Sequence, residues 1–120
     1  MSLRKFETLE KIQGNEGTTI RQIFHPHNTL DGIHHSLAHF TLKKEKRSLL
    51  HRMKTSETYF ILNGVGKLHV DDDVIDVSKN DAVFVPPMSK QFIENTGNSE
   101  LEFLCIVDPP WTRDDEEILE

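Results

Sequence analysis

The amino-acid sequence predicts an all-β protein, either a barrel or a sandwich. Short apolar or alternating runs recur along the chain, and segments rich in Asp, Asn, Gly and Pro separate them, as expected for turns. No segment before residue 110 has a helical period, so alternating helices and strands are not expected. The 120 residues are enough for one hydrophobic core and too few for two, which predicts a single domain over 1–120.

The predicted strands are short and follow one another through tight turns. Their ranges are 18–25, 33–42, 49–53, 57–62, 66–70, 74–77, 82–85, 91–94 and 101–107. Turn-forming residues fill most of the intervals, for example Asn63-Gly64 and Thr96-Gly97-Asn98. The chain is therefore expected to fold as a series of hairpins.

The acidic tail, residues 111–120, is the only segment for which we expect helix. A short helical turn is predicted over 114–119. Trp111, Ile118 and Leu119 would then either cap the mouth of the barrel or join a subunit contact. A loosely ordered acidic tail is the alternative.

Composition excludes several classes of protein. The 14 basic and 20 acidic residues give a formal charge of −6, so nucleic acid is not an expected partner. No apolar stretch is long enough to span a membrane, and no signal region is present at the amino terminus. The single cysteine, Cys105, excludes an intrachain disulfide and suits a reducing compartment. We therefore expect a soluble, cytoplasmic protein.

Potential metal ligands gather at the start of one predicted hairpin. Residues two apart on a strand share a face, so His51 and Met53 point the same way. The short turn over 54–56 can bring Glu57 back beside them. An imidazole and a carboxylate are good donors for divalent iron, manganese, zinc or nickel.

The spacing of these residues resembles two motifs of the cupin superfamily. The first, over about 45–64, reads His51-x-Met53-x3-Glu57-x6-Gly64, and the second, over about 80–95, reads Pro86-x-Met88-x2-Gln91-x3-Asn95. The resemblance implies a small conserved-barrel protein with a jelly-roll-like barrel of six to eight strands. It also implies a homodimer, formed through edge strands or exchanged amino-terminal strands within the first 25 residues.

Several family positions are changed in this chain. Met53 and Gln91 stand where the family has its second and third histidines, and three turn glycines are replaced by Glu45, Asn80 and Met88. The resemblance implies a divalent metal ion (Fe, Mn, Zn or Ni) held by His51, Glu57, Gln91 and Met53. A thioether is a soft donor and a neutral amide a weak one, so lowered affinity is expected. Alternatively, Met53 and Gln91 simply pack in a cavity without metal.

Other histidines are candidates for replacement ligands. His34, His35 and His39 lie on the strand upstream of the first motif, and an exposed position is the default for each. His25 and His27 flank Pro26 in a predicted loop, at the barrel rim or in solvent, and solvent is the favoured place.

Two functions follow from the resemblance. The first is a metal-dependent enzyme, dioxygenase or isomerase-like, acting on a small organic molecule or sugar derivative, with Glu57 or Tyr59 assisting proton transfer. The second is a small-molecule-binding module that needs no metal and performs no catalysis. In either case an apolar pocket is expected, and its predicted lining is Tyr59, Ile61, Phe84, Ile93, Phe103 and Cys105.

Overall fold

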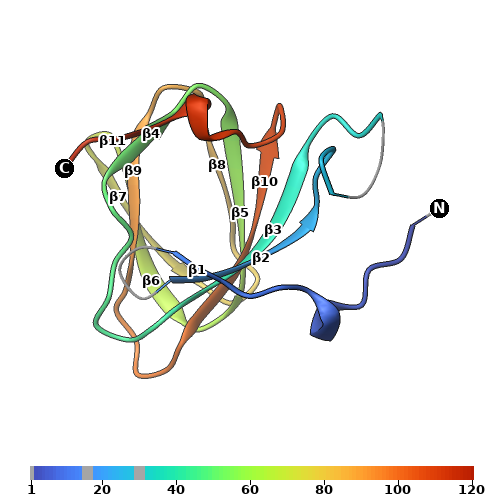
Figure 1. Cartoon of the computed structure of the whole chain (residues 1–120). Coiled ribbons are helices and arrows are strands. Elements are labelled where there is room, and N and C mark those ends of the chain that lie inside the picture. Colours follow the sequence, from blue (N-terminus) through green and yellow to red (C-terminus); the bar gives the residue numbers. More distant parts are fainter. Residues whose placement is uncertain (1, 15–17, 29–31) are drawn as a thin grey trace.

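Two antiparallel β-sheets face each other and form a barrel in the computed structural model, which describes residues 2–14, 18–28 and 32–120 (Figure 1). The first sheet has six strands in the order β1-β2-β3-β10-β5-β8, and the second has five in the order β11-β4-β9-β6-β7. The all-β prediction is confirmed. None of the helices in the described residues has the length and apolar character that crossing a membrane requires.

The strands agree closely with the predicted ranges. The first sheet contains β1 (Ile12–Gln13), β2 (Thr18–Phe24), β3 (Ser36–Leu42), β10 (Leu101–Asp108), β5 (Ser56–Asn63) and β8 (Ala82–Val85). The second contains β11 (Glu116–Ile118), β4 (His51–Met53), β9 (Lys90–Asn95), β6 (Val65–Val70) and β7 (Asp73–Ser78). Two short 3-10 turns complete the fold, η1 (Phe6–Thr8) and η2 (Arg113–Asp115). Strands β1 and β11 were not predicted, because such short segments show no alternation of their own.

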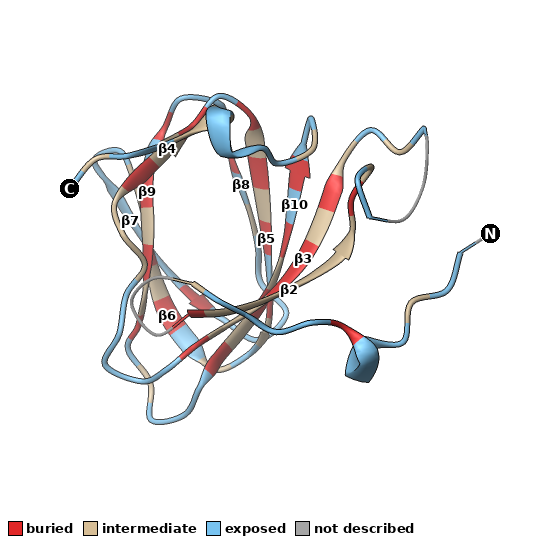
Figure 2. Cartoon of the chain, in the orientation of Figure 1, coloured by how far each residue is buried: buried red, intermediate tan, exposed pale blue. Residues whose placement is uncertain are grey.

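The core lies between the sheets, because alternate residues of each strand point inward (Figure 2). Strand β10 lies between β3 and β5, and its inward residues are among the most buried in the chain. The buried cluster comprises Leu42, Tyr59, Ile61, Leu68, Val77, Val85, Ile93, Leu101, Phe103 and Cys105. Five of the six side chains expected to face the interior are in this cluster.

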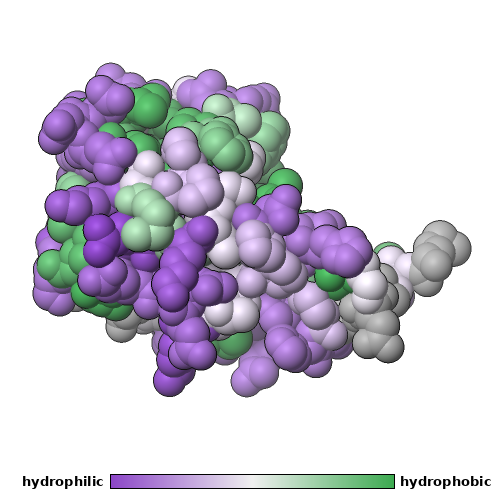
Figure 3. Space-filling view, turned by 90° about the horizontal axis from the view of Figure 1, so that it is seen from above, coloured by the Kyte–Doolittle hydropathy of each residue, from purple (hydrophilic) through white to green (hydrophobic). Residues whose placement is uncertain are grey.

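Phe84 is the exception, and the prediction that it faces the interior is wrong. Its side chain is 61% exposed. Strands β5 and β8 pair so that Glu57 lies opposite Val85 and Thr58 opposite Phe84, which puts Val85 inside and Phe84 outside. Phe60 and Ile106, on the adjacent strands β5 and β10, are also exposed on this sheet. Seen from above, most of the surface is hydrophilic, with patches of hydrophobic residues at the top and at the left of the view (Figure 3).

The acidic tail is an ordered strap rather than a loose end. After the 3-10 turn η2, which matches the expected helical turn, residues 116–118 form β11 and pair with β4. Outside the barrel, two ion pairs hold this strap: Arg52 Nη2 lies 2.7 Å from Glu117 Oε2, and Arg47 Nη2 lies 3.0 Å from Glu120 Oε2. The prediction of helix over 114–119 therefore holds only for its first residues.

His25 anchors the start of the strap, so its expected place in solvent is wrong. The backbone N–H of His27 donates to His25 Nδ1 (3.1 Å), which leaves the ring proton on Nε2. His25 Nε2 then donates to the carbonyl of Trp111 (2.7 Å), and the Trp111 N–H donates to Ser36 Oγ (3.0 Å). The imidazole is 8% exposed, since the strap covers it.

The turn positions that lack the family glycines keep a left-handed backbone. Glu45, Asn80 and Met88 have φ values of 67°, 74° and 71°. Asn tolerates this region, whereas a side chain with an ordinary Cβ is strained there. The fold therefore retains a conformation that suits glycine at Glu45 and Met88.

Substituting Met88→Gly should raise the free energy of unfolding by about 0.5–1 kcal/mol, because relief of the Cβ strain exceeds the entropy that glycine loses on folding. Met88 is 53% exposed, so little packing is lost. Met88→Ala keeps the Cβ and serves as the control, with no gain expected. Urea denaturation of the three proteins makes the measurement, and equal stability of the Gly and Ala variants would contradict the strain.

Candidate functional site

A cavity of about 290 Å³ lies between the sheets, beside the solid core. Strands β1, β2, β3, β5 and β10 line one side, and β4 and β11 line the other. Tyr59, Phe103 and Cys105 belong both to the core cluster and to the cavity lining. These three side chains therefore form the boundary between the filled and the hollow parts of the barrel.

His51 presents one ring nitrogen for hydrogen bonding or ligation. It is 9% exposed, and its Nδ1 lies 2.7 Å from the carbonyl oxygen of Leu49. A carbonyl can only accept, so Nδ1 carries the proton and Nε2 of the neutral ring keeps its lone pair. His51 lines the cavity and pairs with Gln91 on β9.

Glu57 is a buried carboxyl group with one oxygen unsatisfied. Its side chain lines the cavity at the start of β5 and is 6% exposed, and Oε1 has no hydrogen-bond partner among the described residues. Burial raises the pKa of Glu57, and the nearby carboxylate of Glu116 raises it further. The charge of His51 and hydrogen bonding with Cys105 and Tyr59 offset this only in part. Burial thus makes the carboxyl group of Glu57 a weaker acid than an exposed glutamate.

Tyr59 and Gln91 form a buried hydrogen bond behind Glu57. The Tyr59 hydroxyl donates to Gln91 Oε1 over 2.6 Å, and the two residues are 3% and 1% exposed. Burial and the charge of Glu57 raise the pKa of Tyr59 well above its usual value, so it stays a phenol.

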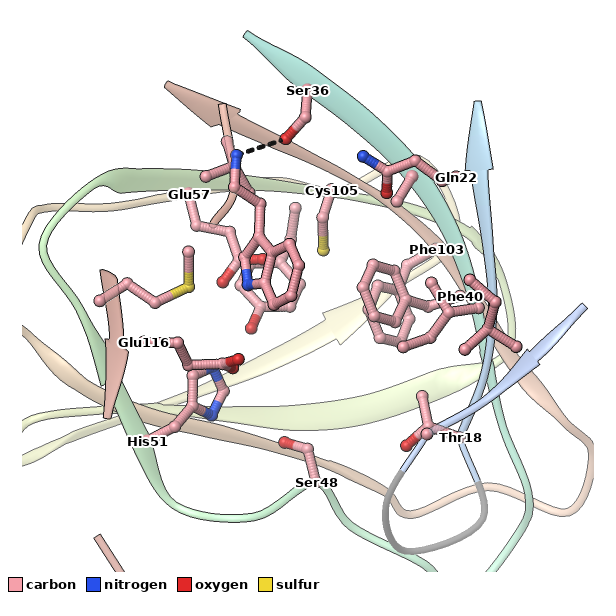
Figure 4. A pocket seen from close by; sticks show the side chains of 18 of the residues that line it. Thr18, Gln22, Ser36, Phe40, Ser48, His51, Glu57, Phe103, Cys105 and Glu116 are labelled. Atoms are coloured by element: carbon pink, nitrogen blue, oxygen red, sulfur yellow. Dashed lines mark hydrogen bonds between the residues drawn. The ribbon is translucent and has the colours of Figure 1, made fainter. Parts of the chain in front are cut away.

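Cys105 is not a candidate nucleophile. Burial, and then the charge of Glu57, raise the pKa of its thiol well above the usual value. The thiol is 1% exposed and lies in the cavity wall (Figure 4).

Glu116 is a site residue that the sequence did not reveal. Strand β11 pairs with β4 so that Glu116 lies opposite Met53 and Ile118 opposite His51. Opposed residues share a face of a sheet, so Glu116 projects with Met53 into the cavity, as Figure 4 shows. Only the pairing of the strap with β4 brings this carboxylate in, and nothing in the local sequence of the tail signals that pairing.

The residues named from the motifs do converge. His51, Met53, Glu57 and Tyr59 all line the cavity, and Gln91 is bonded to Tyr59. The upstream histidines do not join them. Ser36, Ala38 and Phe40 are the β3 residues that line the cavity. His39 points to the outer face, where Nε2 lies 3.1 Å from Glu102 Oε2 and the ring packs on Phe6. It is 7% exposed, so the default of an exposed strand histidine is wrong for His39.

These residues do not fit the full metal centre that the motifs imply. In the described part of the chain, no three His, Cys, Asp or Glu side chains are arranged to hold a metal ion. His51 and Glu57 are the two strong donors at the motif positions. Of the two motif positions where the family has histidines and this chain does not, one holds Gln91, whose amide oxygen already accepts a hydrogen bond from Tyr59. The other holds Met53, which offers only a thioether.

Fold and site together define a small β-barrel protein with a ligand-sized cavity. Residues 38–107, more than half of the chain, match the family model for the cupin domain. The chain belongs to the cupin family.

Known relatives agree with this assignment. The chain is 36% identical over 117 residues to the uncharacterized protein MJ1618 of Methanocaldococcus jannaschii, covering 97% of this chain and 93% of that protein. It is 37% identical over 51 residues to an oxalate-binding protein of Thermotoga maritima, which covers 42% of each chain. The crystal structure of the cupin-2 domain Rru_A2000 from Rhodospirillum rubrum has a TM-score of 0.82 at 22% identity, covering 99% of this chain and 80% of that one.

The raised pKa of Glu57 predicts a specific pH dependence of stability. When the pKa of a carboxyl group is higher in the folded than in the unfolded chain, its protonated form favours the folded state. This stabilisation is complete below the pKa of the unfolded chain, and it is lost as the pH rises through the pKa of the folded chain. The reference pKa is 4.5, and burial raises it in the folded protein. The wild type should therefore lose stability relative to Glu57→Gln as pH rises above this reference.

Scanning calorimetry from about pH 4 to about pH 8 measures this effect. The Tm of Glu57→Gln minus that of the wild type should grow with pH. The same substitution at the exposed Glu10 is the control and should give a nearly constant difference. Parallel profiles for Glu57→Gln and the wild type would show that Glu57 is not protonated by burial.

Proposed function

We propose that this chain binds a small organic molecule in the barrel cavity and exchanges a proton with it through Glu57. The observation that carries the proposal is a cavity of about 290 Å³ with a buried carboxyl group whose Oε1 has no partner. An unsatisfied buried polar atom is costly, and a bound ligand would supply the missing hydrogen bond. Aromatic and aliphatic walls would hold the rest of the molecule.

The proposed chemistry is general acid–base catalysis of an isomerase-like kind. Glu57, whose pKa is raised by burial, would be the acid, and Nε2 of His51 would be the base. Tyr59 would orient the Glu57 carboxyl group, since it hydrogen-bonds with Glu57 and its hydroxyl is also held by Gln91. An acid and a base in one water-poor cavity are the elements that a proton shift within a substrate requires.

A divalent ion (Fe, Mn, Zn or Ni) is the second candidate, and a dioxygenase activity would depend on it. His51 and Glu57 would hold the ion, with Met53 and Gln91 as weak ligands. Two observations favour it: the unpartnered Glu57 Oε1, and the Nδ1 bond to Leu49, since metal-ligating histidines usually fix their second nitrogen this way. When bound, such an ion supplies Lewis-acid or oxygen chemistry.

Calorimetric titration of chelator-stripped protein separates the two candidates. We expect no tight uptake of manganese, iron(II), zinc or nickel, because the donor set is incomplete. We also expect a fragment library of small organic molecules to give thermal-shift hits with the same stripped protein. Stoichiometric metal uptake that Glu57→Gln abolishes would instead favour the metal-dependent enzyme.

The hits should be lost when the cavity is filled. Ala38→Leu adds volume inside the cavity, whereas Thr41→Leu adds the same side chain on the outer face of the same strand. Hits that persist in Ala38→Leu, or that vanish equally in Thr41→Leu, would place binding elsewhere. A stripped protein without any hits would count against the proposed function.

We also propose a homodimer in a reducing, cytoplasmic setting. The exposed Phe60, Phe84 and Ile106 on one sheet face, together with the amino-terminal segment, are the surfaces available for a second copy. The buried free thiol of Cys105 suits a reducing compartment. Sedimentation equilibrium of the full chain tests the dimer, and a monomer at micromolar concentration would overturn it.

A further inference from the structure

We propose that the ligand of this cavity is a small organic cation, a protonated amine on an apolar body, bound between the carboxyl groups of Glu57 and Glu116. This inference rests on the proposed small-molecule binding and adds the charge of the ligand to it. The evidence is that two carboxyl groups line the cavity, that Glu116 has no ion-pair partner among the described residues, and that one oxygen of Glu57 has no hydrogen-bond partner there.

The described cavity lining has two carboxyl groups and no lysine or arginine, so the imidazole of His51 is its one basic side chain. Glu57, Glu116 and His51 are the ionisable side chains of acid or imidazole type in the described lining, and no lysine or arginine is among the described residues there. The segments 15–17 and 29–31, which lie outside the described residues, contain no lysine or arginine either. An anionic ligand would therefore meet two carboxyl groups, with His51 as the only basic side chain in the described lining.

Glu116 lacks the ion pair that its neighbours on the strap have. Glu117 pairs with Arg52 and Glu120 pairs with Arg47, both on the outside of the barrel. No described residue forms an ion pair with Glu116, whose side chain projects into the cavity. Arginines thus neutralise the carboxylates on the outer face of the strap. Glu116, on the inner face, has no arginine partner and is available to a ligand in the cavity.

The two carboxyl groups are close enough to influence each other. The charge of Glu116 raises the pKa values of both Glu57 and Tyr59. An ammonium group between Glu57 and Glu116 would reverse this effect, because it favours the ionised form of both carboxyls. It would also donate to Glu57 Oε1, the buried oxygen without a partner.

The remaining walls suit the apolar body of such a molecule. Tyr59, Phe40, Phe103 and Trp111 line the cavity, and the Phe40 and Phe103 rings stack at a centroid distance of 5.3 Å. Aromatic faces attract cations as well as apolar groups. A dicarboxylate such as oxalate has neither the charge nor the apolar surface for this lining, whatever the oxalate-binding relative uses to hold its own ligand.

The test uses chelator-treated full-length protein and matched probes. Benzylamine and cyclohexylamine are compared with benzyl alcohol and cyclohexanol, which have similar shapes without charge, and with benzoate and oxalate. Isothermal titration at neutral pH should detect the amines, with the alcohols weaker and the anions absent.

Variants of the strap assign the effect to Glu116. Glu116→Gln should weaken amine binding about tenfold or more, as expected for loss of one charge-assisted hydrogen bond, and should leave alcohol binding nearly unchanged. Glu117→Gln is the control, since it alters the next residue and loosens the strap without touching the cavity charge. Equal losses in both variants would mean that only the strap matters, and would overturn the role of Glu116.

The outcomes separate this inference from the proposed function. If the alcohols bind as well as or better than the amines, the cavity binds small molecules but has no preference for cations, and the inference falls alone. If neither class binds, and the wider fragment library gives no hits, both fall. If amines bind only after a divalent ion is added, the carboxylates serve a metal, and the organic cation is ruled out as their partner.

Discussion

The pairing of β11 with β4 is the interaction on which the site depends. This antiparallel contact, formed by residues 116–118 and 51–53, turns an acidic tail into the wall of a cavity. It brings in Glu116 and Ile118 from one segment, and the hydrogen bonds of Trp111 fix the other end of the same strap. Because a strand of such length cannot be stable alone, the arginine pairs outside the barrel and the Trp111 anchors matter to its position. Closure of the cavity and the charge inside it therefore come from the same piece of chain.

The barrel is divided into a filled and a hollow part by a layer of polarisable side chains. Tyr59, Phe103 and Cys105 contact the aliphatic core on one side and the cavity on the other. Glu57 lies at this boundary, where burial raises its pKa although its side chain faces the cavity. A carboxyl group in the middle of the core would have to be satisfied internally, whereas here the cavity leaves room for a partner from outside. This position explains how the fold tolerates an unsatisfied oxygen.

Most of the fold and part of the site could be predicted from the sequence, and the limits have a physical cause. Alternation along a strand decides which residues share a face, so the convergence of His51, Met53 and Glu57 followed from local spacing. Whether a strand face points into or out of the barrel depends on the partner strand. The register of β5 against β8 places Phe84 outside. His25 and Glu116 owe their places to contacts with residues far along the chain, with Trp111 and with Met53 respectively. Such contacts have no local signature, because they arise from how the strap closes.

The changed motif positions point to a change in how the carboxyl group of Glu57 is balanced. In a cupin site with three imidazoles, a bound divalent ion compensates the carboxylate. With Met53 and Gln91 in two of those positions, the strong donors that remain are fewer, and Gln91 is engaged by Tyr59 instead. A proton can then take over the balancing role, which is consistent with the raised pKa of Glu57. A proton held only by burial is easily displaced by a better cation, because the second carboxylate on the strap favours positive charge in the same space. Met53 and Gln91 at two ligand positions, together with Glu116 on the strap, would thus favour a charged organic ligand over a metal ion in this site.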